Sequence, residues 1–498
     1  MYLRAGVFSL GLLLLSRVLG LLRESAQAAA FGSTGMGDAV IVMFTLPDLL
    51  VGVLVSGALY YVLLPFWAQQ SPSNQAASQK KIAYSLMGGG LALGALVWLF
   101  RDAVVQALAP GLSGEIKASS AQWIGWSAAV LPPTMLAALW VTRLLHERDF
   151  VGMHAGSLIV NLVLVCGLLL VANSVAQQMP SLNLLGVCLV IATLGRLAWL
   201  AWRLPASPQP VANAQLTDLP PASVWIWAAL SSGLLLVFPL VARSLASSAG
   251  EGALASFNYA WKLIELPLVL AVQLVASLAF PAITRTVADT PERQQAVGLA
   301  FLIAWALACA AVAVVATFSL PIASLLFGWG RMSATHLEVI AQWSAVGIWS
   351  LLPQALMAVL LTVMATTGRM HLAVWVYALG LSVLLLAGWL GSFNGTSVGT
   401  NVMWLLNTVF ASMAVVLMVL ERRSINGAFP YLACLAPLLA SAGLVLLKPL
   451  FAGLNVTLTL VCCSVYAVLV TGSAVVASPV LRGLLQEKFN QKSAVIKP

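Results

Sequence analysis

The chain is a series of long apolar stretches separated by short polar ones. A bilayer core about 30 Å thick requires roughly 20 apolar residues in each spanning helix, and about fourteen stretches of that length occur. They are continuously apolar rather than alternating, which favours helices over a membrane β-barrel. The pattern therefore predicts an all-α polytopic membrane protein. Its predicted helices lie at about 6–30, 38–67, 82–100, 121–145, 153–173, 182–203, 222–246, 253–280, 296–318, 335–365, 371–390, 398–420, 429–449 and 455–478.

The polar segments divide the predicted helices into groups. The longest, Pro205–Pro221, is rich in Pro, Ala, Ser and Gln and follows the sixth helix. Paired bundles around a site at the membrane midplane are typical of secondary transporters. No residue-level repeat between the two bundles is evident. We therefore predict an N-terminal six-helix lobe at 1–203, a cytoplasmic linker at 204–221, a C-terminal six-helix lobe at 222–423, two additional transmembrane helices at 424–480 and a cytoplasmic tail at 481–498.

Composition and charge agree with a lipid environment. Of the 498 residues, 61% are apolar and 8% are charged, whereas soluble domains are about 25% charged. Most of the 24 Lys and Arg fall in alternate segments on one side, which predicts that both termini are cytoplasmic. The net charge of +9 therefore does not indicate nucleic-acid binding. The cations of the opposite segments are Arg101, Lys117, Arg243, Arg331 and Lys448, and those within or at the ends of helices are Arg17, Arg23, Arg196 and Lys262.

No pattern typical of a metal centre or a soluble enzyme site is present. The six cysteines lie in apolar helices without metal or disulfide spacing. P-loop, H-E-x-x-H and G-x-S-x-G motifs are absent from the sequence. No metal, cofactor or catalytic residue is therefore predicted.

The first helix carries charge at a depth where lipid would be. At about 100° per residue, Arg17, Gly20, Arg23, Glu24 and Gln27 share one face of this helix. Charged groups inside a membrane are costly and usually face a cavity or a partner. One interpretation is a structural ion pair with Glu24 or a carboxylate of the next helix. The other is a site for an anionic ligand, and two arginines favour a phosphate-like group.

Two more helices contain acidic or basic residues. Asp38 lies at the start of the second helix, where it is either an N-cap or a functional carboxylate. Asp48 is in mid-span, which indicates a counter-charge for Arg17 or Arg23, or a proton or cation site. In the eighth helix Lys262 and Glu265 share a face, and a pair in which each satisfies the other is the alternative to a binding role.

The motifs together resemble a known family. Ser16-Arg17-Val18-Leu19-Gly20, Arg23-Glu24, Phe31-Gly32, Asp38-Ala39 and Pro47-Asp48-Leu49-Leu50 are similar to the amino-terminal signature of the MurJ/MviN lipid II flippases of the MOP exporter superfamily. The later matches lie in the same order along the chain. They are Ala109-Pro110-Gly111, Arg148-Asp149-Phe150, Tyr259-Ala260-Trp261-Lys262-Leu263-Ile264-Glu265-Leu266-Pro267 and Leu326-Phe327-Gly328-Trp329-Gly330-Arg331.

The resemblance implies a fold and a function. Two six-helix lobes would surround a central cavity, with two further helices forming a groove for a lipid tail. The protein would translocate an undecaprenyl-diphosphate-linked precursor across the bacterial cytoplasmic membrane by alternating access, with membrane lipids and cell-wall synthesis proteins as partners. The matched positions that would carry this activity are Arg17, Arg23, Asp38 and Glu265, with Lys262 where the family has an arginine. In the mechanism that we expect, Arg17, Arg23 and Lys262 bind the diphosphate, and Glu24, Asp38, Asp48 and Glu265 provide charge compensation or ion coupling.

Several positions depart from the family pattern. The family has Asn at Asp48, an arginine near Val51 and Gly52, a glutamate at Ser56, an aspartate at Trp261 and an arginine at Lys262. These differences leave open another undecaprenyl-linked oligosaccharide as substrate. A membrane-embedded glycosyltransferase or ligase would be expected to have a large hydrophilic loop with catalytic carboxylates, and a non-transporting scaffold would not need the retained charges. Coupling to the membrane potential, a proton or a cation stays open.

Overall fold

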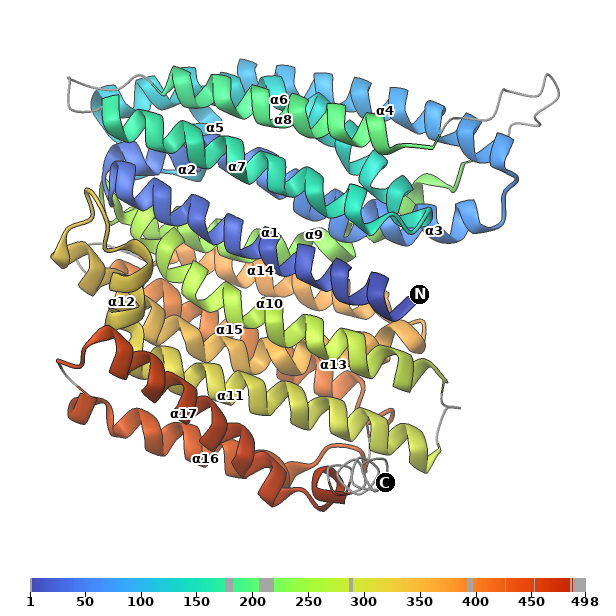
Figure 1. Ribbon diagram of the computed structural model, residues 1–498, viewed down its shortest axis with the longest axis vertical. Coiled ribbons are helices and arrows are strands. Elements are labelled where there is room, and N and C mark those ends of the chain that lie inside the picture. Colours follow the sequence, from blue (N-terminus) through green and yellow to red (C-terminus); the bar gives the residue numbers. More distant parts are fainter. Residues whose placement is uncertain are drawn as a thin grey trace, which may run out of the picture. The chain divides into compact units, whose positions relative to one another are not determined.

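The structure, a computed structural model, is helical throughout its described parts (Figure 1). It describes residues 2–174, 182–205, 219–285, 290–391, 397–425, 427–451, 453–483 and 486. The elements up to the tenth α-helix are α1 (Tyr2–Phe31), α2 (Gly35–Val53), the π-helix η1 (Leu54–Ala58), α3 (Leu59–Ala68), α4 (Pro72–Leu99), α5 (Arg101–Leu108), α6 (Gly114–His146), α7 (Phe150–Ser174), α8 (Asn183–Arg203), α9 (Ala222–Ser247) and α10 (Ala253–Arg285). Those that follow are α11 (Pro291–Phe327), α12 (Ala334–Gly347), the 3-10 helix η2 (Ile348–Ser350), α13 (Leu351–Thr366), α14 (Met370–Leu390), α15 (Val398–Leu420), α16 (Tyr431–Leu446), the 3-10 helix η3 (Lys448–Phe451) and α17 (Val456–Ala477).

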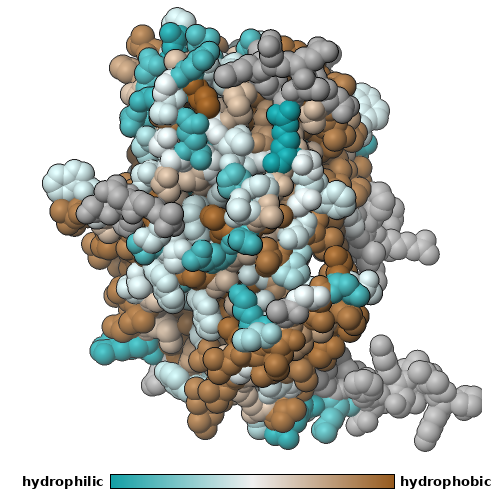
Figure 2. Space-filling view, turned by 90° about the vertical axis from the view of Figure 1, so that its left-hand side faces the viewer, coloured by the Kyte–Doolittle hydropathy of each residue, from teal (hydrophilic) through white to brown (hydrophobic). Residues whose placement is uncertain are grey.

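The helices confirm the predicted fold class. Every predicted apolar stretch coincides with one helix or with helices in direct succession, such as α2, η1 and α3 over 38–67. Among the described residues, 11 helices are long and apolar enough to cross a membrane. The number of fourteen spans stays a prediction. In Figure 2, which faces the ends of the helices, hydrophobic residues lie mainly along the edges and the lower part, and hydrophilic residues lie among neutral ones over the middle and the top.

Local sequence signals explain where the helices differ from the predicted ranges. α4 begins ten residues before the predicted start at 82, because Ser71 caps it by accepting from the Asn74 N–H and Pro72 stands at its first position. The short helix α5 was not predicted, since its eight residues are neither long nor apolar enough to give a membrane signal. Polar helix extensions of this kind are invisible to a search for apolar stretches.

The chain divides into two compact units. Unit 1 comprises Met1–Asn258 and Phe327–His336, and unit 2 holds the rest of the described chain after Asn258. The boundary falls inside α10. The predicted linker at 204–221 lies largely outside the described residues, as does most of the tail at 481–498. The predicted lobe limits therefore stay predictions.

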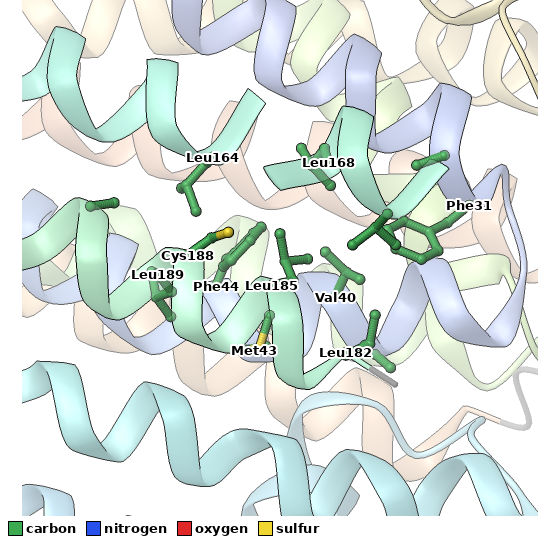
Figure 3. Packing of buried hydrophobic residues seen from close by; sticks show 14 of the residues in the cluster. Phe31, Val40, Met43, Phe44, Leu164, Leu168, Leu182, Leu185, Cys188 and Leu189 are labelled. Carbon is green, nitrogen blue, oxygen red and sulfur yellow. The ribbon is translucent and has the colours of Figure 1, made fainter. Parts of the chain in front are cut away.

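Unit 1 packs around a core shared by α1, α2, α6, α7 and α8. Figure 3 shows Phe31 and Val40 from the first two helices beside Leu168 and Leu185 from α7 and α8. Helices in lipid are held by close van der Waals packing rather than by the exclusion of water. α9 joins this unit where α2 ends and η1 begins, and the Ser232 hydroxyl there donates to the Val53 carbonyl oxygen at 3.4 Å. The core thus fixes the inner helices that carry the predicted site residues.

Unit 2 holds α16 and α17 against α11. The Trp305 indole N–H donates to the Cys434 carbonyl at 2.9 Å, and the Ser441 hydroxyl donates to the Cys309 carbonyl at 2.9 Å. Both bonds join α11 to α16. The backbone of α11 leaves helical geometry at Phe318, three residues before Pro321, as expected for a proline kink.

The two halves of the chain contain the same succession of helices, displaced by 220 positions. Gly114–His146 and Ala334–Thr366 both have 33 residues, and the next helices begin at Phe150 and Met370. The expectation that no residue-level repeat exists is therefore wrong. The repeat was missed because the helical pattern is kept while most side chains differ. Residues identical at this displacement include Arg23 with Arg243, Gly32 with Gly252, Pro47 with Pro267, Ala121-Gln122-Trp123 with Ala341-Gln342-Trp343, and Pro133 with Pro353.

The turns before α7 and α14 show the repeat at backbone level. In each, the last residue before the new helix donates its N–H to a carbonyl five residues back, at 2.8 Å for Asp149 and 2.9 Å for Arg369. The residue before it has a left-handed φ, 61° at Arg148 and 71° at Gly368. Only the second repeat has the glycine that this conformation favours.

We expect Arg148→Gly to stabilise the protein by about 0.5–1 kcal/mol. A side chain in the left-handed region costs about 1–2 kcal/mol, and the added freedom of glycine in the unfolded chain offsets part of the gain. Gly368→Ala, at a position with open space around it, should destabilise by about 1 kcal/mol for the same reason. Thermal unfolding of the purified variants in detergent measures both changes. Equal melting temperatures in all three proteins would contradict the prediction.

Candidate functional site

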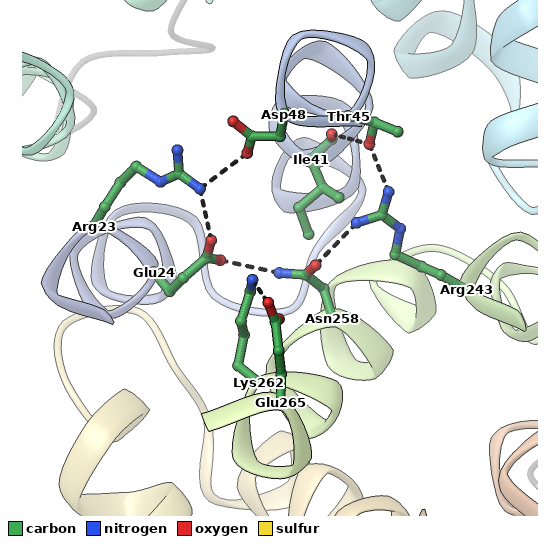
Figure 4. Close-up of polar contacts among 9 residues, drawn as sticks. All are labelled: Arg23, Glu24, Ile41, Thr45, Asp48, Arg243, Asn258, Lys262 and Glu265. Atoms are coloured by element: carbon green, nitrogen blue, oxygen red, sulfur yellow. Dashed lines mark hydrogen bonds and ion pairs between the residues drawn. The ribbon is translucent and has the colours of Figure 1, made fainter. Parts of the chain in front are cut away.

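Arg23 of α1 lies between two carboxylates. Its guanidinium bonds Glu24 at 3.0 Å and Asp48 of α2 at 3.1 Å (Figure 4). The Arg23 side chain is 12% exposed, whereas that of Asp48 is 56% exposed. The structure thus brings together three of the predicted site residues. The exposure of Asp48 shows that the ion pair is open on the Asp48 side.

A chain of hydrogen bonds continues from this ion pair to a second arginine. Glu24 accepts from the Asn258 amide of α10 at 3.0 Å, and Asn258 accepts from Arg243 of α9 at 2.9 Å. Arg243 also donates to the Thr45 hydroxyl of α2 at 2.6 Å (Figure 4). Four helices of unit 1 therefore meet in one polar network. It contains two guanidinium groups, those of Arg23 and Arg243.

Arg243 is a site residue that the sequence reasoning missed. It was assigned to an outer segment, but it lies inside α9, four residues before the end of the helix at Ser247. The signal that identifies it is the repeat, since Arg243 stands 220 positions after Arg23 and Asn258 stands 220 positions after Asp38. The Asn258 amide donates an N–H to Glu24. An aspartate at position 258, as at Asp38, would instead be repelled by the Glu24 carboxylate.

Asp38 caps a helix other than its own. Its carboxylate accepts the Gly252 N–H at 2.6 Å and the Ala255 N–H at 2.7 Å, at the start of α10, and the residue is 1% exposed. The N-cap of α2 is Thr34, which accepts the Gly37 N–H. Of the two alternatives for Asp38, the N-cap of the second helix is therefore wrong. A carboxylate at a helix N-terminus is stabilised by the unpaired N–H groups and the helix dipole.

The turns around Asp38 close one end of unit 1. Gly252 has a φ of 84°, and a Cβ there would collide with the Ser33 carbonyl, so only glycine fits. The Arg331 N–H donates to the Ala29 carbonyl at 3.0 Å, and Gly111 donates to the Ser247 hydroxyl at 2.9 Å. Segments 29–38, 111–113, 247–255 and 329–332 thus meet at one end, as the predicted alternating topology requires. The side of the membrane stays a prediction.

Lys262 and Glu265 form an ion pair on α10, in unit 2. Their charged atoms are 2.8 Å apart, and both side chains are partly exposed (Figure 4). The alternative in which the two residues satisfy each other therefore describes this conformation. The neighbouring Trp261, where the family has an aspartate, is buried.

The remaining predicted positions lie in unit 1. Arg17 is exposed on α1 and interacts electrostatically with His154 of α7. Val51 and Gly52 are partly buried on α2, and a Cβ at Gly52 would lie 2.8 Å from a methyl group of Leu236. A large side chain there would displace Leu236, which agrees with the missing arginine. The side chain of Ser56 lies outside the described residues.

Helices of this length with ionic networks among them define a polytopic membrane transporter fold. A solved inward-facing multidrug resistance MATE family transporter of the MOP superfamily has a TM-score of 0.65 at 14% identity, over 82% of this chain and 95% of that one. A solved structure described as lipid II flippase MurJ, inward closed conformation, has a TM-score of 0.77 at 15% identity, over 96% of this chain and 100% of that one. These likenesses show the fold.

The family model of the lipid II flippase MurJ matches residues 27–478. The chain therefore belongs to the lipid II flippase MurJ family, which confirms the resemblance drawn from its motifs. The lipid II flippase MurJ of Burkholderia cenocepacia is 23% identical over 354 residues, 67% of each chain. The probable lipid II flippase MurJ of Rickettsia prowazekii is 23% identical over 294 residues, and the match spans only 56% of that relative's length.

Proposed function

We propose that the protein is a flippase that moves lipid II, a polyprenyl-diphosphate-linked cell-wall precursor, across the bacterial cytoplasmic membrane by alternating access. It would thereby serve peptidoglycan biosynthesis and cell shape. The observation that carries the proposal is Arg23, held between Glu24 and the exposed Asp48 inside apolar helices of a MurJ-family chain. A guanidinium that is open to an ion at membrane depth suits a phosphate headgroup.

In the proposed mechanism Arg17, Arg23 and Lys262 bind the diphosphate. The planar fork of a guanidinium matches phosphate oxygens. In this conformation two of these cations form ion pairs with carboxylates. Arg23 pairs with Glu24 and Asp48, and Lys262 pairs with Glu265. A ligand shifts a conformational equilibrium only through its differential affinity for the two states. The headgroup would therefore drive the change by replacing the carboxylates as partner of the cations.

For the empty carrier to return, the carboxylates must form their ion pairs with the cations again. Glu24, Asp38, Asp48 and Glu265 are the groups through which a proton or a cation would act. The membrane potential is an alternative source of energy, since moving one charge through 100 mV is worth about 2.3 kcal/mol. No cofactor takes part in this scheme. The partners are the undecaprenyl-linked substrate, the surrounding lipids and proteins of cell-wall synthesis.

Some charges of the family pattern are missing from this chain, and their absence favours a second candidate substrate. A side chain at Gly52 would have to displace a methyl group of Leu236, and Trp261 buries an indole where the family has a carboxylate. A headgroup with a different glycan would meet fewer charges at these positions. The second candidate is therefore another undecaprenyl-linked oligosaccharide, of a capsule, an exopolysaccharide or an O-antigen.

Depletion of the protein tests the function directly. We expect lipid II to accumulate and to become resistant to a membrane-impermeant hydrolase added outside, because the precursor remains on the inner leaflet. Re-expression of the wild-type chain should restore cleavage. Accumulation of a different undecaprenyl-linked glycan would establish the second candidate. Unchanged pools and accessibility of all such lipids would refute the flippase proposal.

A further inference from the structure

A further arginine is buried in unit 1 at Arg196 of α8. It lies thirteen residues after the start of the helix at Asn183 and seven before its end at Arg203, and it is 7% exposed. No hydrogen bond or ion pair joins its guanidinium to any residue in the described part of the chain, and its Nε atom is fully buried without a partner. The proposed mechanism does not use this group.

An arginine in this state is costly in a membrane helix. Burial removes the charge from water, and no hydrogen bond or ion pair within the described chain compensates for that loss. Charged groups persist at such depth where they face a water-filled cavity or bind a counter-ion. The contrast on the same helix is Arg203, whose guanidinium bonds Asp149 at 2.7 Å. Structural pairing therefore explains Arg203 and leaves Arg196 unexplained.

The surroundings of Arg196 connect it to the Arg23 site. Asp48 of α2 and Tyr60 of α3 interact electrostatically with Arg196, and Asp48 already bonds Arg23 at 3.1 Å. One carboxylate is thus shared by cations from α1 and α8. The Asp48 side chain is more than half exposed, so the described chain does not enclose this carboxylate. The stem of Arg196 packs beside Gly156 of α7, which leaves the space that the long side chain needs.

We propose that Arg196 is a further substrate ligand, which binds a phosphate group of the lipid-linked diphosphate together with Arg23. Two guanidiniums from different helices match the four or more oxygens of a diphosphate better than one does. In the empty protein Asp48 balances them in part. This inference rests on the proposed function. Arg196 would supply a cation in place of the arginine that the family has near Val51 and Gly52.

The test measures binding and stability in the full-length protein in lipid nanodiscs. The probes are undecaprenyl diphosphate incorporated in the disc and inorganic pyrophosphate in solution. We expect Arg196→Gln to weaken undecaprenyl diphosphate binding by about tenfold to a hundredfold, as the loss of a charge-assisted contact does. Its melting temperature should be unchanged or higher, because a buried charge without a partner has been removed.

The matched control is Arg203→Gln on the same helix. It should lower the melting temperature, since Asp149 loses its partner, and leave binding unchanged. Arg196→Lys keeps the charge without the fork, and its affinity should fall between those of the wild type and Arg196→Gln. This variant also tests the proposal if Arg196→Gln fails to fold.

The outcomes separate this inference from the function on which it rests. If the wild type does not bind undecaprenyl diphosphate, the flippase proposal fails. If the wild type binds it and both Arg196 variants bind equally well, Arg196 is not a ligand. If only pyrophosphate binding depends on Arg196, the group takes a free phosphate and the lipid headgroup is excluded. A lower melting temperature of Arg196→Gln without loss of affinity would show a structural role.

Discussion

Arg23→Ala is expected to abolish transport, and the double variant Arg23→Ala with Glu24→Gln is expected to remain inactive. Removing Arg23 alone leaves Glu24 buried without its cation, so a loss of activity in that variant has two explanations. The double variant removes both charges, and the glutamine still accepts from Asn258. The carboxylate that remains without Arg23 is Asp48, whose side chain is 56% exposed and therefore tolerates the loss. If Arg23 only balances Glu24, the double variant should work again. If Arg23 binds the diphosphate, it cannot.

The measurement is lipid II accessibility or growth at matched membrane levels. The control is a pair outside the proposed site, Arg203 and Asp149, which are 2.7 Å apart. Arg203→Gln combined with Asp149→Asn should retain transport, because an exchange of both partners leaves no unpaired charge. Recovery of transport in the Arg23 and Glu24 double variant would assign Arg23 a purely structural role.

Much of the fold was predictable because lipid imposes a simple rule on sequence. Each spanning helix must be apolar over about 20 residues, so hydropathy alone located the helices. The same rule does not detect α5, because this helix is too short. It also placed Arg243 outside α9, because a charged residue near the end of an apolar stretch is assigned to the adjoining loop. Helix limits set by caps, as at Ser71, follow from local hydrogen bonding and lie beyond what hydropathy detects.

The site was predictable only where its residues share one helix. The polar face of α1 follows from the helical period, and so does the pairing of Lys262 with Glu265. The partners of Asp38 are 214 and 217 residues away, and nothing in the local sequence indicates them. The family resemblance identified the position of Asp38 but not the bonds it makes. Long-range contacts of this kind depend on how the helices pack.

The two repeats use equivalent positions for different chemistry. Asp38 accepts two backbone N–H groups at a helix end, whereas Asn258, its equivalent, both donates and accepts between Glu24 and Arg243. A carboxylate suits the first position because both neighbours are donors. An amide suits the second because one neighbour is an acceptor and the other a donor. The repeat therefore yields one helix cap and one bridge between Glu24 and Arg243.

Asp38→Ala is expected to open the closed end of unit 1 and to abolish transport. The variant leaves the N–H groups of Gly252 and Ala255 without their acceptors. Hydrogen bonds to a charged group are worth about 1.5–3 kcal/mol each, so about 3–6 kcal/mol would be lost from the closed arrangement. Asp38→Asn should be nearly as severe, since its amide nitrogen would face one of the two donors.

The readout is the reactivity of Ser33→Cys with a membrane-impermeant maleimide, in a background without the six native cysteines. Ser33 is 2% exposed, so the thiol should be protected in the otherwise unchanged chain and labelled when Asp38 is replaced. Thr34→Ala is the matched control. It removes the cap of α2 itself, which costs about 1 kcal/mol, and should leave the thiol protected. Protection that persists in Asp38→Ala would show that other contacts hold this end closed, and that Asp38 acts through its charge instead.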